Sequence, residues 1–127
     1  MKELQELFNE VKKKFPEINA KLIKGEIISI MASRPFGKNI IYNSANLKKY
    51  NFSELALKGL LAHELAHKIQ AKRAGIIEKI KVFLYQKFKL FNNKEEGERI
   101  EREADKIAMS KGFKKEIKTF YKEKYGK

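Results

Sequence analysis

The sequence predicts an α+β domain, in which a small three-stranded twisted sheet is combined with several helices. Apolar residues recur at helical spacing in the N-terminal, central and C-terminal parts of the chain, and β-branched residues are concentrated between positions 20 and 44. A chain of 127 residues is long enough for one hydrophobic core. We therefore expect a single compact domain over 1–127, divided into a helix plus the sheet (1–52), a long central helix (53–74), two further helices (76–112) and a helical tail (113–127).

The first part of the chain predicts one helix followed by three short strands. A helix over 2–15, with an apolar stripe, ends before Pro16, because proline cannot continue a helix. The stripe consists of Leu4, Leu7, Phe8 and Val11. Residues 20–33 are rich in isoleucine and predict two strands with a turn at Gly25, and 39–44 predicts the third.

The central helix is predicted over 54–73, after a loop at 46–51. Ser53 is suited to cap its N-terminus and Gly75 to end it. An apolar residue recurs every four positions and forms a core stripe. The stripe consists of Leu57, Leu61, Leu65 and Ile69. We therefore expect this helix to pack on one face and to line a site on another.

Three helical segments are predicted after the central helix. Residues 76–91 combine large apolar side chains with lysines, which predicts an amphipathic connecting helix that packs on the core, self-associates or lies on an anionic membrane. Residues 95–108 are strongly helical in composition. The tail over 113–127 is basic and aromatic with helical spacing, which predicts a terminal helix and a second candidate surface for self-association.

The pentapeptide from His63 to His67, with sequence H-E-L-A-H, contains both histidines of the protein. Residues four apart lie on one face of a helix, so both imidazoles can approach a common atom, and neutral imidazole is a preferred zinc ligand. Glu64 then lies beside the metal, where a general base can act on metal-bound water. The alternative is a chance pair of surface histidines. Residues 59–67 carry one acid and no basic residue in a chain that is 35% charged, which argues against a solvated face.

The helix over 95–108 supplies a candidate third ligand. Glu101 lies at the edge of its apolar stripe, and a carboxylate near a core needs a cation or a donor. We therefore predict that His63, His67 and Glu101 bind one Zn²⁺ per chain, with Glu98 as the alternative third ligand. Asp105, one turn further on, can accept a hydrogen bond from the outer nitrogen of a ligating histidine. The pattern does not distinguish zinc from another divalent metal.

Together the two motifs H-E-L-A-H and E-R-E-A-D resemble those of the gluzincin metallopeptidases, in particular the HtpX-type catalytic core and, even more, the small soluble minigluzincins. The similarity covers roughly residues 39–108. It implies a zinc-dependent endopeptidase with Glu64 as base and proton shuttle, and Asp105 as the residue that orients a ligand. The spanning helices of the membrane members have no counterpart here, and the tyrosine or histidine that stabilises the transition state in many gluzincins cannot be assigned.

The resemblance also implies where a substrate binds and how activity is controlled. The strand before the central helix would be the sheet edge above the cleft, and would bind a protein or peptide substrate by β-augmentation; an ordinary paired strand is the alternative. The residues concerned are Asn39, Ile40, Ile41, Tyr42 and Asn43. In minigluzincins a C-terminal segment can enter the cleft and make the enzyme latent, a role for which Tyr121 or Tyr125 is available. Deletion after Gly112 would then raise activity.

Composition restricts the other functional classes. The net charge is +13 and the pI about 9.8, but the lysines are spread over the whole chain and no nucleic-acid motif is visible, so a nucleic-acid partner is not favoured. The absence of cysteine excludes disulfides and thiolate metal sites. The first residues do not form a signal peptide and no uncharged run is long enough to span a membrane, which predicts a cytoplasmic protein. The alternatives to an enzyme are a non-catalytic zinc-containing binding module and a basic nucleic-acid-associated protein.

Overall fold

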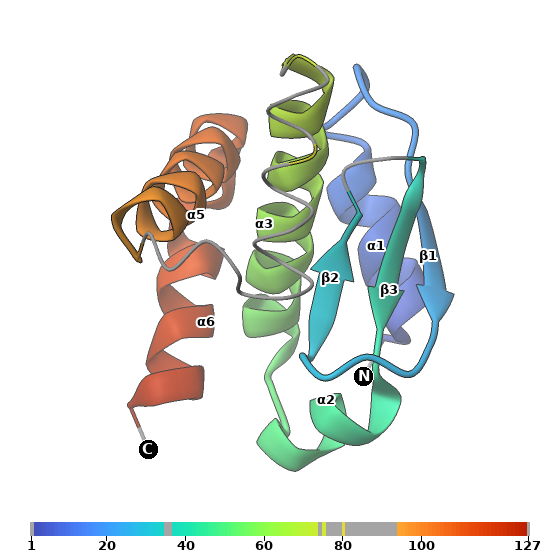
Figure 1. Ribbon diagram of the computed structural model, residues 1–127. Coiled ribbons are helices and arrows are strands. Elements are labelled where there is room, and N and C mark those ends of the chain that lie inside the picture. The colour runs from blue at the N-terminus through green and yellow to red at the C-terminus, as the bar shows by residue number, and fades with distance from the viewer. Residues whose placement is uncertain (1, 35–36, 74, 76–79, 81–93, 127) are drawn as a thin grey trace.

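The computed structural model describes residues 2–34, 37–73, 75, 80 and 94–126 (Figure 1). Over these residues the chain has an α+β fold with one small mixed sheet. The amphipathic helix expected over 76–91 lies outside the described residues, apart from the single position 80. The elements are α1 (Leu4–Lys12), β1 (Lys21–Lys24), β2 (Met31–Ser33), β3 (Asn39–Tyr42), α2 (Ser44–Tyr50), α3 (Glu54–Arg73), α5 (Lys94–Ala108), a π-helical turn (Met109–Phe113) and α6 (Lys114–Tyr125).

The predicted order of a helix, three strands, a long helix and two later helices is confirmed for this part of the chain. The cap of α3 is confirmed as well, because the Ser53 hydroxyl accepts a hydrogen bond from the Ala56 amide at 3.2 Å. The loop predicted over 46–51 was wrong, because α2 covers most of it. The Asn43 side chain accepts a hydrogen bond from the Asn46 amide at 3.1 Å, so Asn43 caps a helix where a strand residue was expected.

The sheet has the order β1-β3-β2, with β1 parallel and β2 antiparallel to β3 (Figure 1). The strand at 39–42 is therefore the central strand, and the prediction that it forms the exposed sheet edge was wrong. Its backbone groups pair on both sides: Leu22 of β1 and Ser33 of β2 both lie opposite Ile40. Among the described strands, β1 and β2 are the edges.

Helix α3 lies in the middle of the molecule, with the sheet and α1 on one side and α5 and α6 on the other (Figure 1). Leu61, Leu65 and Ile69 are buried as predicted, and Leu57 is partly buried. The helix is enclosed more completely than predicted, because thirteen of its residues between Ala56 and Ala71 are buried and they lie on all its faces. The histidine-bearing face of α3 is therefore enclosed by α5 and α6.

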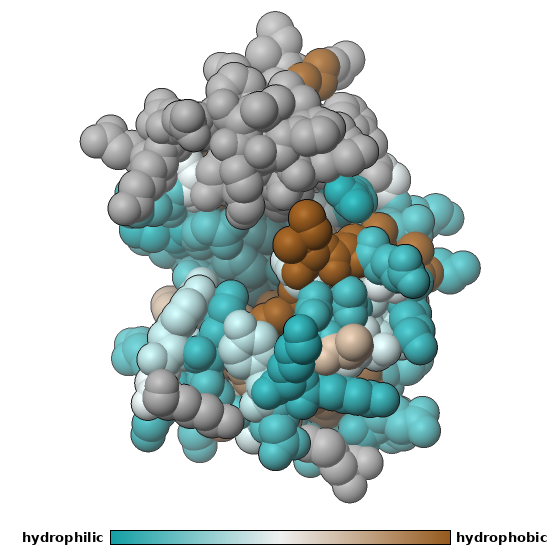
Figure 2. Space-filling view, turned by 60° about the horizontal axis from the view of Figure 1, so that its bottom comes forward, coloured by the Kyte–Doolittle hydropathy of each residue, from teal (hydrophilic) through white to brown (hydrophobic). Residues whose placement is uncertain are grey.

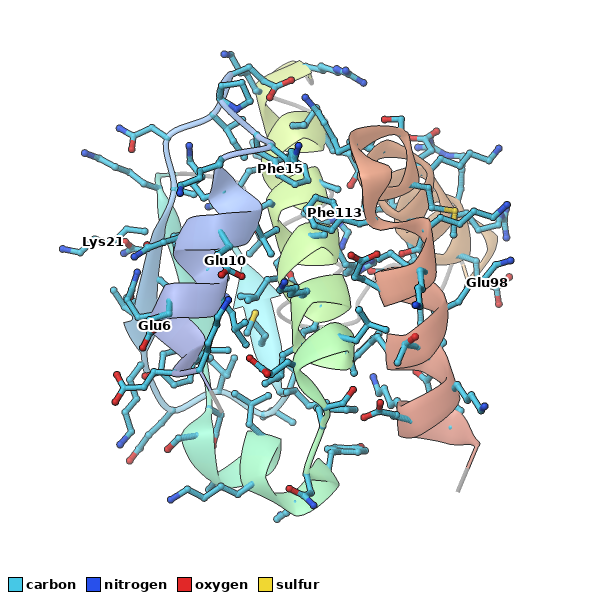
Figure 3. The ribbon with its side chains drawn as sticks, turned by 180° about the vertical axis from the view of Figure 1, so that it is seen from behind. Glu6, Glu10, Phe15, Lys21, Glu98 and Phe113 are labelled. Carbon is cyan, nitrogen blue, oxygen red and sulfur yellow. The ribbon has the colours of Figure 1, made fainter. Side chains whose placement is uncertain are left out.

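The two sides of the molecule also meet beyond α3. Seen from behind, α1 covers one face of the sheet, and Phe15 after α1 lies close to Phe113 before α6 (Figure 3). The centroids of these two rings are 6.0 Å apart and their planes are 16° from parallel. Both rings belong to the core cluster that includes Leu7, Ile40 and Ile117. The C-terminal segment is thus part of the hydrophobic core.

Helix α6 approaches α3 very closely at Gly59, where a Cβ atom would lie 2.2 Å from the Glu116 carbonyl oxygen. We expect Gly59→Ala to destabilise the protein by about 1–3 kcal/mol, because overpacking forces the helices apart, although alanine favours a helix by about 1 kcal/mol. Urea unfolding measures the change. Gly75→Ala is the matched control, since a Cβ there has no neighbour within 4 Å, and its effect should stay within about 0.5 kcal/mol. Equal stabilities of the two variants would contradict the close packing of α3 and α6.

The surface is largely hydrophilic on the face shown in Figure 2, with one hydrophobic area between the polar side chains. Exposed lysines lie on β1, α2, α5 and α6, so the positive charge is not confined to one element. Among the described helices, none combines the length and the apolar character needed to cross a membrane.

Candidate metal centre

Three side chains from two helices converge between α3 and α5. His63 and His67 are one turn apart on α3, and their Nε2 atoms are 3.0 Å apart. Glu101 approaches from α5, and its Oε2 lies 2.7 Å from His63 Nε2 and 3.5 Å from His67 Nε2. Both imidazoles are buried, whereas the Glu101 side chain is 40% exposed. The three atoms form one compact set of nitrogen and oxygen donors that opens toward solvent on the Glu101 side.

Each imidazole is held by a hydrogen bond at its other nitrogen. His63 Nδ1 lies 2.7 Å from Asp105 Oδ1, and His67 Nδ1 lies 2.7 Å from Gln70 Oε1. The Gln70 amide nitrogen donates to the Ile100 carbonyl at 2.9 Å, which leaves its oxygen as the acceptor. Both rings therefore carry a proton on Nδ1, and their Nε2 atoms face each other.

This donor set fits a metal ion. Two Nε2 lone pairs and a carboxylate oxygen repel one another at these distances unless a proton or a cation lies between them. Two imidazole nitrogens and one carboxylate, each within 4.8 Å of the others, form the ligand set of catalytic zinc sites, which leave a fourth position for water. The residues present could thus hold one Zn²⁺.

The protonation of the metal-free centre reflects the same geometry. Burial disfavours the charged imidazole, but the hydrogen bonds to Asp105 and Glu101 outweigh it and raise the pKa of His63 to about 10. Burial also disfavours the charged form of Glu101, but hydrogen bonds to His63 and His67 outweigh it and lower the pKa of that carboxyl. A proton thus occupies the position that a metal would take, and metal binding must displace it.

Glu64 lies next to this centre on α3 and is only 7% exposed. Burial raises the pKa of its carboxyl, although the neighbouring His67 and His63 act in the opposite direction. The backbone of Ser33 in β2 lies near this carboxyl and also acts to lower its pKa. A carboxyl whose pKa is raised toward neutrality is suited to take up and release a proton.

The position of Ser33 places β2, an edge strand of the described sheet, beside this centre. The Arg34 amide donates to the Asn39 carbonyl, and the Asn43 amide donates to the Ile30 carbonyl, so even-numbered residues of this strand pair with β3. Backbone groups alternate in direction along a strand, so those of Met31 and Ser33 point away from β3. The edge of the sheet that borders Glu64 is therefore β2.

Lys68 fixes the loop after β2 to the same helix. Its side chain is buried one turn after Glu64, and its ammonium donates to the carbonyl oxygens of Arg34 and Gly37, the latter at 3.1 Å. Burial lowers the pKa of Lys68 to about 8, against the opposing effect of the Glu64 charge. Helix α3 therefore lies against β2 at Glu64 and holds the loop after β2 through Lys68.

The structure separates the predicted site residues into two groups. His63, Glu64, His67, Glu101 and Asp105 come together, although they lie up to 42 positions apart in the sequence. By contrast, the strand residues Asn39, Ile40, Ile41 and Tyr42 lie in the central strand, and Asn43 caps α2. Glu98, the alternative ligand, is exposed on the outer side of α5 (Figure 3).

The tail does not have the position expected of a plug. Tyr121 donates a hydrogen bond to Asp105 Oδ2 at 2.9 Å, so it lies on the Nδ1 side of His63, away from Nε2. Tyr125 stacks on Tyr121 and is 68% exposed. These contacts do not place either tyrosine between the donor atoms, and the blocking role of the tail stays a prediction.

Sequence reasoning missed three residues of the centre and one contact: Ser33, Lys68, Gln70 and the hydrogen bond made by Tyr121. Gln70 had a sequence signal, because it follows His67 by three positions and so shares its helix face. The contacts of the other three connect different elements and have no local signal.

Comparison with known proteins found no matching family model, no matching curated protein and no matching solved structure.

Proposed function

We propose that this protein is a zinc-dependent endopeptidase, with His63, His67 and Glu101 as metal ligands and Glu64 as general base. The observation that carries the proposal is the convergence of two Nε2 atoms and one carboxylate oxygen beside a second carboxyl, the buried one of Glu64. Two imidazoles, one carboxylate and an adjacent glutamate are the components of zinc peptidase chemistry.

The residues have separate tasks in hydrolysis. Zinc bound by these ligands supplies polarisation of the scissile carbonyl and acidification of the attacking water. Glu64 takes the proton of that water as it attacks the carbonyl carbon, and then passes the proton to the leaving amine nitrogen as the C–N bond breaks. Asp105 and Gln70 hold the two imidazoles in the tautomer that keeps Nε2 free for the metal.

The substrate strand in this proposal is β2 instead of β3. An extended peptide that pairs with the outward-facing Met31 amide and Ser33 carbonyl would lie along the edge that borders Glu64. Such pairing uses backbone groups only, so it restricts the conformation of the substrate more than its sequence. Lys68 donates hydrogen bonds to the loop after β2 and so holds this strand against α3, the helix that carries His63 and His67.

Metal analysis combined with a caseinolytic assay tests the proposal. Wild type should contain about one zinc per chain and hydrolyse casein, and Glu101→Ala should lose both, because a site with two protein ligands binds zinc weakly. Glu98→Ala is the matched control, since it removes an exposed carboxylate from the same helix. It should retain the zinc and the activity.

The other outcomes select among the remaining functions. Wild type without metal, even after addition of zinc, would contradict the proposal. Bound zinc without hydrolysis of any peptide would favour a non-catalytic zinc-containing binding module. Loss of zinc in Glu98→Ala together with retention in Glu101→Ala would move the third ligand to Glu98.

A further inference from the structure

We propose that Tyr121 is a positioning residue of the zinc centre, which holds the Asp105 carboxylate against His63 and so couples the C-terminal helix to the metal site. The inference rests on the proposed function in one respect: the centre must bind zinc. It goes further by making α6, a helix without any metal ligand, a determinant of zinc affinity.

Three helices contribute to one chain of hydrogen bonds. The Tyr121 hydroxyl of α6 donates to Asp105 Oδ2 on α5 at 2.9 Å, and Asp105 Oδ1 accepts from His63 Nδ1 of α3 at 2.7 Å. Each oxygen of the Asp105 carboxylate therefore accepts one hydrogen bond, Oδ2 from Tyr121 and Oδ1 from His63. At the other end of this series of hydrogen bonds, His63 Nε2 faces His67 and Glu101.

Tyr121 is held firmly enough to act in this way. Its ring centroid is 5.2 Å from that of Phe120, and Tyr125 stacks on it at 6.0 Å with planes 13° from parallel. Phe120 and Ile117 are buried in the core and fix α6 against α3. Burial and the nearby Asp105 charge raise the pKa of Tyr121, so its hydroxyl keeps the proton that it donates.

The second hydrogen bond limits the rotation of the carboxylate. The terminal torsion of an aspartate is broad, so a carboxylate held at one oxygen can turn over a wide range. A donor at the second oxygen narrows this range and keeps Oδ1 directed at His63 Nδ1. Because the partner of a ligating histidine fixes its tautomer and orientation, loss of the Tyr121 hydroxyl should weaken zinc binding while leaving the ring packing intact.

Zinc affinity of Tyr121→Phe, measured by competition with a chromophoric chelator at one pH, tests the inference. The dissociation constant should rise roughly tenfold, at the lower end of the range for groups that support a metal ligand. Tyr125→Phe is the matched control, because it removes the same hydroxyl from an exposed ring one turn further along α6. Its dissociation constant should change by less than about twofold. Thermal unfolding of both metal-free variants shows whether the fold is equally retained.

A double-mutant cycle separates positioning from a general effect on packing. If Tyr121 acts through Asp105, Tyr121→Phe should cause no further loss of zinc affinity when Asp105 is already alanine. An equal loss with and without Asp105, or a Tyr121→Phe affinity equal to that of Tyr125→Phe, would overturn the inference. The comparison of the two tyrosine variants stands even if Asp105→Ala does not fold.

The same measurements distinguish this inference from the proposed function. Absence of zinc binding in wild type would overturn both. Zinc binding that depends on Tyr121, in a protein that hydrolyses no peptide, would overturn the proposed function and support the positioning role.

Discussion

Replacement of Glu64 by glutamine is expected to leave zinc bound and to lower peptide hydrolysis by about 10²–10⁴-fold, the usual contribution of general acid–base catalysis. Glutamine has the shape of glutamate and can occupy the same buried position. It cannot take up the proton of the attacking water. The ligands His63, His67 and Glu101 are unchanged, so the metal should remain.

Steady-state hydrolysis of a fluorogenic peptide, with zinc content measured on the same samples, checks this expectation. Glu54→Gln is the matched control, because it makes the same exchange in the first turn of the same helix, and it should keep normal turnover. Wild-type turnover in zinc-loaded Glu64→Gln would exclude Glu64 as the base. Loss of zinc together with activity would instead give Glu64 a role in maintaining the site.

The convergence of His63, His67 and Glu101 could be predicted because the signals of these residues are local. Two histidines four apart share a helix face whatever surrounds the helix, and an acidic residue at the edge of an apolar stripe must lie near the core. Asp105 follows from Glu101 by the same four-residue spacing. Each of these signals lies within a single helix, and both helices, α3 and α5, are present in the structure.

The sheet order could not be predicted in this way, because it depends on pairing between distant strands. β1 and β2 are separated by residues 25–30, and this connection lets β2 pass to the far side of β3. Periodicity identifies strands but does not order them. The substrate edge was therefore placed on the strand nearest to α3 in sequence, whereas β2 is the strand that borders Glu64.

The burial of α3 on all sides has a similar cause. Its polar side chains include Glu64 and Lys68, and its face with His63 and His67 is predicted from the sequence to line a site. In the structure these side chains are satisfied by contacts with other elements, such as Asp105 for His63 and the Arg34 and Gly37 carbonyls for Lys68. A polar helix face can be enclosed when each of its groups finds a partner, and those partners come from elsewhere in the chain.

Deletion of all residues after Gly112 is expected to unfold the protein, in contrast to the gain of activity that a blocking tail would imply. The deletion removes three core side chains, those of Phe113, Ile117 and Phe120. Burial of each stabilises the fold by about 1.5–3 kcal/mol, and a domain of this size has about 5–15 kcal/mol in all. The deletion also removes the Glu116 backbone, which packs against Gly59, and so exposes this glycine. Circular dichroism during heating should show no cooperative transition.

A chain that ends at Tyr125 is the control, because it keeps α6 and should unfold cooperatively like the full protein. The two outcomes lead to opposite views of the C-terminal segment. A truncated chain that folds, binds zinc and hydrolyses peptide faster than wild type would make α6 an inhibitor, and would contradict its place in the core. A truncated chain that cannot fold would mean that this segment is needed for the fold itself. Any control of activity by the segment must then act through contacts such as Tyr121–Asp105. Such contacts change how firmly the proposed ligands are held, and they do not open or close a cleft.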